Sequence, residues 1–62
     1  MLYVSEGKSK NKSVNNLCKE ISKYYIVHWN FNKGNYYVKY NKIYYKVYFT
    51  KTSCGYESLV KI

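Results

Sequence analysis

The sequence predicts a small α+β domain in which one amphipathic helix packs on a three-stranded antiparallel sheet, in the order α-β-β-β, with a short C-terminal helix as an optional last element. Its 62 residues suffice for one small domain. Apolar residues repeat with a helical period between positions 14 and 21, and with a period of two between positions 26 and 50. Hydrophobic residues make up 47% and aromatic residues 21% of the chain, which is too much for a disordered basic tail.

The helix is predicted from Val14 to about Lys23. Ser13 precedes it as the predicted N-cap, because a serine hydroxyl can accept a hydrogen bond from a free amide of the first turn. Apolar residues at positions i, i+3, i+4 and i+7 then form one face: Val14, Leu17, Cys18 and Ile21. Such a short helix needs a partner surface. We expect that surface to be the sheet.

Three strands are predicted where β-branched and aromatic residues dominate, at Ile26–Phe31, Tyr36–Tyr40 and Ile43–Thr50. Residues 32–35 join the first two strands, and Gly34 can adopt the positive φ that such a loop requires. Asn41 and Lys42 form the second turn. Asn tolerates the left-handed region, whereas Lys in place of Gly is unusual there.

The predicted register is consistent between the two hairpins. Closing the second turn gives the pairs Tyr40–Ile43, Val38–Tyr45 and Tyr36–Val47. Closing the first loop gives the pairs Phe31–Tyr36, Trp29–Val38 and Val27–Tyr40. Because cross-strand partners lie on the same face of a sheet, both hairpins turn the same residues of the central strand inward. The predicted inward face comprises Val27, Trp29, Phe31, Tyr36, Val38, Tyr40, Ile43, Tyr45, Val47 and Phe49.

The two ends of the chain have weaker patterns. Residues 7–12, Gly-Lys-Ser-Lys-Asn-Lys, predict a polar loop or mobile arm, so residues 1–12 could form a flexible basic arm, although Leu2–Val4 could make a short strand. Residues 51–55 predict a turn. The last segment, Tyr56–Ile62, favours a helix slightly over a strand that pairs near Leu2–Val4.

The outward face of the predicted sheet and the charge of the chain indicate a binding function. Eleven lysines and three glutamates give a formal net charge of +8, which favours a negatively charged partner. The outward face alternates rings, which can stack on bases, with ammonium groups, which can neutralise phosphates. We expect binding to DNA or RNA with weak sequence selectivity, because the chain has no arginine. The candidate nucleic-acid-binding residues are His28, Tyr37, Lys39, Tyr44, Lys46 and Tyr48, assisted by Lys8, Lys10 and Lys12.

The predicted order of elements, over residues 13–62, resembles the double-stranded-RNA-binding fold and the HicA-type toxins. The chain lacks the Gly-Ser-His segment of those toxins, so no catalytic residue transfers from them. Topology alone does not establish function. We therefore assign no family from the sequence.

Two other functions stay open. The small size and the aromatic surface also suit a protein, of the sort that phages or mobile elements encode, that binds and inhibits a host or defence protein as anti-CRISPR proteins do. His28 could be the general base of a small ribonuclease toxin, but it has no obvious partner, and we expect no enzyme. A homodimer through the Tyr-rich face is compatible with either binding function. Lys, Asn, Tyr and Ile form over half of the chain, and an A+T-rich genome would enrich all four without selection for binding.

Cys18 and Cys54 are the only thiols, and with one histidine they cannot supply the four ligands of a structural zinc. We expect no metal and no cofactor. The N-terminus has no basic region followed by an apolar stretch and a cleavage site, so we expect no secretory signal and reduced thiols. The longest apolar run, residues 24–27, is far shorter than the roughly 20 residues that span a bilayer. We therefore expect a cytoplasmic protein without a membrane segment.

Overall fold

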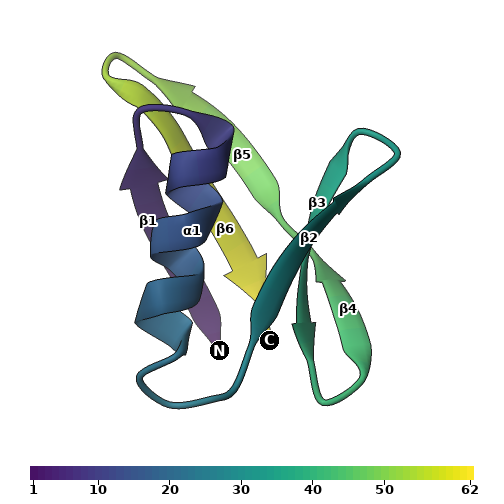
Figure 1. Ribbon diagram of the computed structural model, residues 1–62. Coiled ribbons are helices and arrows are strands. Elements are labelled where there is room, and N and C mark those ends of the chain that lie inside the picture. The colour runs from purple at the N-terminus through teal and green to yellow at the C-terminus, as the bar shows by residue number, and fades with distance from the viewer.

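The computed structural model describes residues 1–62 and contains one helix and six strands in two three-stranded antiparallel sheets (Figure 1). Sheet A has the order β1-β6-β5 and comprises β1 (Leu2–Gly7), β6 (Gly55–Lys61) and β5 (Tyr48–Thr52). Sheet B has the order β2-β3-β4 and comprises β2 (His28–Asn32), β3 (Asn35–Tyr40) and β4 (Ile43–Lys46). The predicted α+β class is confirmed, and sheet B is the predicted meander. Sheet A, built largely from the two chain ends, is an addition to it.

The helix α1 (Lys10–Ile21) begins four residues before its predicted start. Ser9 is the N-cap, and its hydroxyl accepts a hydrogen bond from the Lys12 amide at 3.2 Å. The prediction of Ser13 as the N-cap is wrong: Ser13 is fully buried inside the helix, and its hydroxyl donates to the Ser5 carbonyl at 3.1 Å. Residues 2–12 therefore lie in β1, a short connection and the first turn of α1, where the sequence predicts a basic arm.

The predicted strand Ile43–Thr50 is divided at Val47 between the two sheets. Lys46 pairs with Tyr37 in sheet B, whereas Tyr48 pairs with Leu59 in sheet A. Val47 is buried, and its amide donates to the Tyr36 carbonyl at 2.9 Å. The bend at this residue allows the two halves of one strand to follow different sides of a common core.

The predicted register of sheet B is confirmed in four pairs: Tyr40–Ile43, Val38–Tyr45, Phe31–Tyr36 and Trp29–Val38. The pair Val27–Tyr40 is not formed, because β2 begins at His28. Tyr36 and Val47 keep a backbone hydrogen bond but lie outside the ladder. Both turns have consecutive positive φ angles, 50° and 81° at Lys33 and Gly34 and 53° and 66° at Asn41 and Lys42, as type I′ hairpin turns require.

The helix predicted at Tyr56–Ile62 is wrong, and the alternative strand is present as β6. This strand lies between β1 and β5, and its backbone is paired on both edges. Ser58 and Val60 alternate inward and are fully buried. The last element is therefore a strand, and β1 precedes the helix, so the element order that resembles the double-stranded-RNA-binding fold and the HicA-type toxins is not observed.

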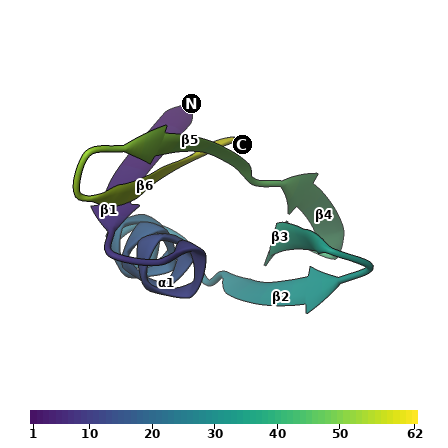
Figure 2. The same ribbon diagram turned by 90° about the horizontal axis from the view of Figure 1, so that it is seen from above.

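The core lies between α1 and the two sheets, which Figure 2 shows surrounding a common interior. It consists of Tyr3, Val14, Leu17, Cys18, Ile21, Val27, Val38, Val47 and Val60. The helical stripe and most of the predicted inward face are confirmed, but Phe31 and Ile43 are 57% and 53% exposed. These two residues lie beside the hairpin turns at the two ends of sheet B, beyond the surface that the core fills. The single helix, with 12 residues, is too short and too polar to cross a bilayer.

Candidate nucleic-acid interface

Backbone pairing in sheet B aligns six side chains on the face turned away from the core. They form two rows across the strands, His28–Lys39–Tyr44 and Asn30–Tyr37–Lys46. Paired residues of antiparallel strands lie on one face, and the intervening Val38 is fully buried on the other face. The alternation predicted from the sequence therefore holds in the structure. We call these six residues the Tyr/Lys platform.

Each platform lysine lies against an aromatic ring. The Lys39 ammonium is 5.3 Å from the centre of the Tyr44 ring, and the Lys46 ammonium is 5.5 Å from the centre of the Tyr48 ring. Both distances are within the roughly 6 Å over which a cation and a ring attract each other. The rings of Tyr37 and Tyr44 meet edge to face with centroids 6.4 Å apart. These contacts hold two cations and their neighbouring rings close together.

The exposure of the rings leaves them available for contact. Tyr44 is 51% exposed and Tyr48 is 59% exposed, whereas Tyr37 is half-buried. Tyr48 belongs to β5 of sheet A, not to sheet B as the single predicted strand implied. Its contact with Lys46 nevertheless places it at the border of the platform.

A shallow hollow of about 460 Å³ lies at the β2–β3 end of the platform. Its lining combines rings and amides, from Asn30, Phe31, Asn32, Tyr37 and Tyr44. Phe31 lines this hollow, although alternation along the strand predicts that it faces inward. Alternation along the strand could not reveal its role, because its exposure depends on how far the core extends under the hairpin.

An aromatic cluster beneath the platform joins the two sheets. The Tyr36 ring contacts the rings of Trp29, Phe31 and Phe49, with centroid distances of 5.6, 4.8 and 5.2 Å. Its hydroxyl donates a hydrogen bond to the Asn11 side-chain oxygen on α1. Tyr36 thus ties β3 to both β5 and the helix, which fixes the orientation of sheet B and of its platform.

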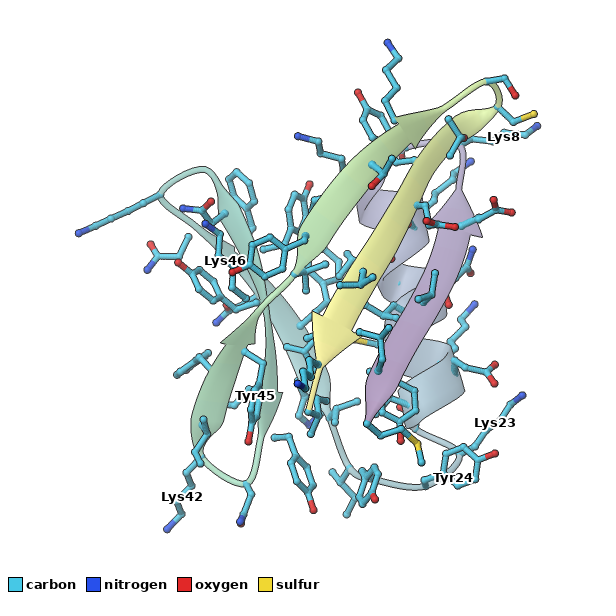
Figure 3. The ribbon with its side chains drawn as sticks, turned by 180° about the vertical axis from the view of Figure 1, so that it is seen from behind. Lys8, Lys23, Tyr24, Lys42, Tyr45 and Lys46 are labelled. Carbon is cyan, nitrogen blue, oxygen red and sulfur yellow. The ribbon has the colours of Figure 1, made fainter.

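The three lysines predicted to assist the platform lie elsewhere. Lys10 is at the start of α1, with its ammonium 5.4 Å and 5.5 Å from the ring centres of Phe49 and Tyr56. Lys12 is exposed on the first turn of α1. Figure 3 places Lys8 near the β5–β6 turn, away from Lys42 and Lys46. The structure therefore gathers Lys39 and Lys46 but does not bring Lys8, Lys10 or Lys12 to the same surface.

His28 is exposed, and its side chain makes no hydrogen bond or ion pair within the chain. Its cross-strand neighbour is Lys39, a cation that offers no help to a general base. It also borders a second hollow, between α1 and β2, whose lining includes Lys19 and Trp29. No three His, Cys, Asp or Glu side chains lie close enough together to hold a metal ion. The residues next to His28 are therefore Lys39 across the strand and, at the hollow, Lys19 and Trp29.

The two cysteines are free and differ in environment. Cys18 is buried in the core, and burial raises the pKa of its thiol from 9.0 to about 11. Cys54 is exposed in the turn between β5 and β6. A thiolate is the reactive form of cysteine, so Cys18 is protected both by its position and by its raised pKa.

Comparison with known proteins identifies no relative: no protein-family model matches the chain, and neither curated proteins nor solved structures give a significant match.

Proposed function

We propose that the protein binds single-stranded nucleic acid through the Tyr/Lys platform, with weak sequence selectivity. The observation that carries the proposal is the register of sheet B, which brings Lys39, Lys46 and the rings of Tyr37 and Tyr44 onto one exposed face. Exposed rings on a sheet can stack only on bases whose faces are free. Bases within a duplex are already stacked on each other, so the platform favours a single strand.

Two kinds of contact supply the affinity. Stacking of one base on an aromatic ring contributes about 1–3 kcal/mol, and Tyr44 is the more accessible of the two platform tyrosines. The ammonium groups of Lys39 and Lys46 bind phosphates and release counterions. The hollow beside Asn30 and Tyr44 accommodates one base, whose edge the amide can contact. Without arginine the commonest side chain for bidentate contact to guanine is absent, so we expect weak sequence selectivity.

Fluorescence anisotropy with labelled single-stranded and duplex oligonucleotides tests the proposal. We expect tighter binding to the single strand and affinity that falls steeply with salt. Tyr44→Leu should weaken binding about 5- to 150-fold, the equivalent of one lost stacking contact. Tyr24→Leu is the matched control, since Tyr24 is 68% exposed but lies between α1 and β2, outside the platform. No binding at about 50 mM salt would end the proposal.

The electrostatic contribution has its own control. Replacing Lys39 and Lys46 with Gln should lower the slope of log affinity against log salt by about 1.4, or about 0.7 for each lost phosphate contact on a single strand. Replacing Lys8 and Lys51 with Gln removes the same charge at the β5–β6 end of the molecule. Equal effects of the two double variants would mean that net charge, and not the platform, attracts the nucleic acid.

A second candidate function has its own observation. Met1, Tyr24 and Ile26 are 79%, 68% and 86% exposed, and large apolar side chains of this kind are typical of protein-binding surfaces. They would suit a phage or mobile-element protein that inhibits a host or defence protein. A pull-down from nuclease-treated host lysate separates the candidates: protein partners that are retained, and lost with Ile26→Ser, favour this second function.

A further inference from the structure

The face of sheet A opposite α1 is uncovered, and Figure 3 looks onto it. Its middle row runs across all three strands as Val4, Leu59 and Tyr48. Leu2 lies next to Val4 on the same side of β1, and the two are 55% and 42% exposed. This face of sheet A therefore carries an apolar strip that consists of Leu2, Val4, Leu59 and Tyr48.

Charges lie on both sides of this strip, and they are segregated by sign. On one side Glu6 and Glu57 are direct cross-strand partners, which places two of the three glutamates of the chain together. Like charges directly opposite each other destabilise a sheet. No lysine lies within ion-pair distance of either glutamate, since the side-chain ion pair of the molecule joins Lys23 and Glu20 at 3.0 Å. On the other side of the strip Lys61 stands opposite Leu2.

The outward residues of β6 are consequently Glu57, Leu59 and Lys61, at equal spacing. Successive outward residues are about 6.7 Å apart along a strand, so Leu59 is the midpoint between opposite charges. Two copies can pack with these faces together around a two-fold axis that lies between the sheets and is perpendicular to the strands. The strands of the second copy then run in the opposite direction. This arrangement puts Leu59 against Leu59 of the second copy and Glu57 against the second copy's Lys61, twice in each pair of molecules. An axis parallel to the strands would instead oppose Glu57 to Glu57.

We propose that this face binds a second copy of the chain in an isologous two-fold dimer, with Leu59 near the axis and reciprocal Glu57–Lys61 contacts on either side. Self-complementary surfaces of this kind are the usual basis of homodimers. The dimer covers the apolar strip and brings a cation to Glu57, one member of each carboxylate pair. It does not depend on the proposed nucleic-acid function, and it uses a different face from the Tyr/Lys platform.

The size of the face indicates a weak dimer. Three strands and about six residues span on the order of 14 by 20 Å, so the pair buries about 1,000 Å² or less in total. This is below the range of stable complexes, and we expect dissociation constants of about 10–100 µM.

Sedimentation velocity of nuclease-treated protein, from about 5 µM to 1 mM, tests the proposal. The average mass should rise from that of one chain to that of two. Glu57→Lys and Lys61→Glu should each weaken the dimer about tenfold, because each change converts two attractions into repulsions. The double reversal E57K/K61E restores the complementarity with the charge order inverted and should return the dissociation constant to within about threefold of the wild-type value.

Lys42→Glu is the control for Lys61→Glu, since it makes the same charge change in the β3–β4 turn of sheet B. It should leave dimerisation unchanged within about twofold. Circular dichroism of each variant identifies any loss of fold, and the double variant keeps the test decisive if one single variant unfolds. A wild-type chain that stays monomeric at 1 mM would overturn the proposal. So would a double reversal as weak as the single variants, or a dimer that responds only to Tyr44→Leu on the platform.

Discussion

Replacement of Ser58 tests how closely the helix approaches sheet A. Ser58 is fully buried in β6 and faces α1. Its hydroxyl is 3.1 Å from the Ser13 carbonyl on the helix and 3.3 Å from the Ser5 carbonyl on β1. The small side chains of Ser13 and Ser58, both with no exposed surface, allow the two backbones to come this close.

The geometry separates two substitutions by their expected cost. Ser58→Ala removes the hydroxyl that donates to the Ser13 and Ser5 carbonyls. The Ser5 carbonyl still accepts a hydrogen bond from the Ser13 hydroxyl. We therefore expect the free energy of unfolding to fall by about 1 kcal/mol. Ser58→Val loses the same hydroxyl and also adds bulk where the backbones meet. Overpacking of this kind costs a further 1–3 kcal/mol or so, for a total of about 2–4 kcal/mol.

Thermal and urea unfolding followed by circular dichroism measure both effects. In a domain of this size about 1 kcal/mol lowers Tm by roughly 4–8 °C, so Ser58→Val should melt at least about 8 °C below the wild type. Ser53→Ala, in the exposed β5–β6 turn, should change stability by less than about 0.5 kcal/mol. If Ser58→Val were as stable as the wild type, α1 could not lie as close to β6 as the structure places it.

Three further predictions concern the N-cap of α1, a glycine contact and a buried thiol. Ser9→Ala should lower the free energy of unfolding, measured in urea, by about 1 kcal/mol because it removes the N-cap. Ser9→Asp should retain most of that stability, and equal stability of the wild type and both variants would contradict the role of Ser9 as N-cap. Gly55→Ala should lower Tm by about 8 °C or more, since φ is +150° and an added Cβ would stand 2.3 Å from the Gly7 carbonyl oxygen; an unchanged Tm would refute this contact. The Cys18 thiol ionises near pH 9.0 when unfolded but has a pKa of about 11 when folded, so the unfolded chain loses its proton first and stability falls from pH 9 to about 11. Cys18→Ala should remove part of that fall in pH-dependent melting, and an identical profile would show that the thiol does not cause it.

The platform and the proposed dimer face use different parts of the molecule. The platform lies on sheet B, whereas the dimer face lies on sheet A, and the strand that crosses between them bends at Val47. A dimer through sheet A would leave both platforms free. Two linked platforms would bind a long strand more tightly than one, through the higher effective concentration of the second site. Binding of long oligonucleotides should therefore weaken in Lys61→Glu, while binding of short ones should not.

Patterns in the sequence were sufficient to predict those elements whose contacts join residues close together along the chain. The stripe from Val14 to Ile21 and the register of the two hairpins in sheet B depend on spacings of a few residues. The outward alternation of Tyr37, Lys39, Tyr44 and Lys46 follows from that register. Most of the candidate site could therefore be predicted without coordinates.

The tertiary structure decided what depends on contacts between distant residues. β6 is a strand because β1, from the other end of the chain, pairs with the edge that the β5–β6 hairpin leaves open, which outweighs the slight preference of Tyr56–Ile62 for a helix. Ser13 is buried and Ser9 caps the helix because β1 brings Ser5 against the helix start. The charge-segregated face of sheet A exists only once residues 2–6 and 57–61 are paired. Backbone hydrogen bonds across more than 50 residues leave no periodic signal in the sequence, whereas hairpins and helices do.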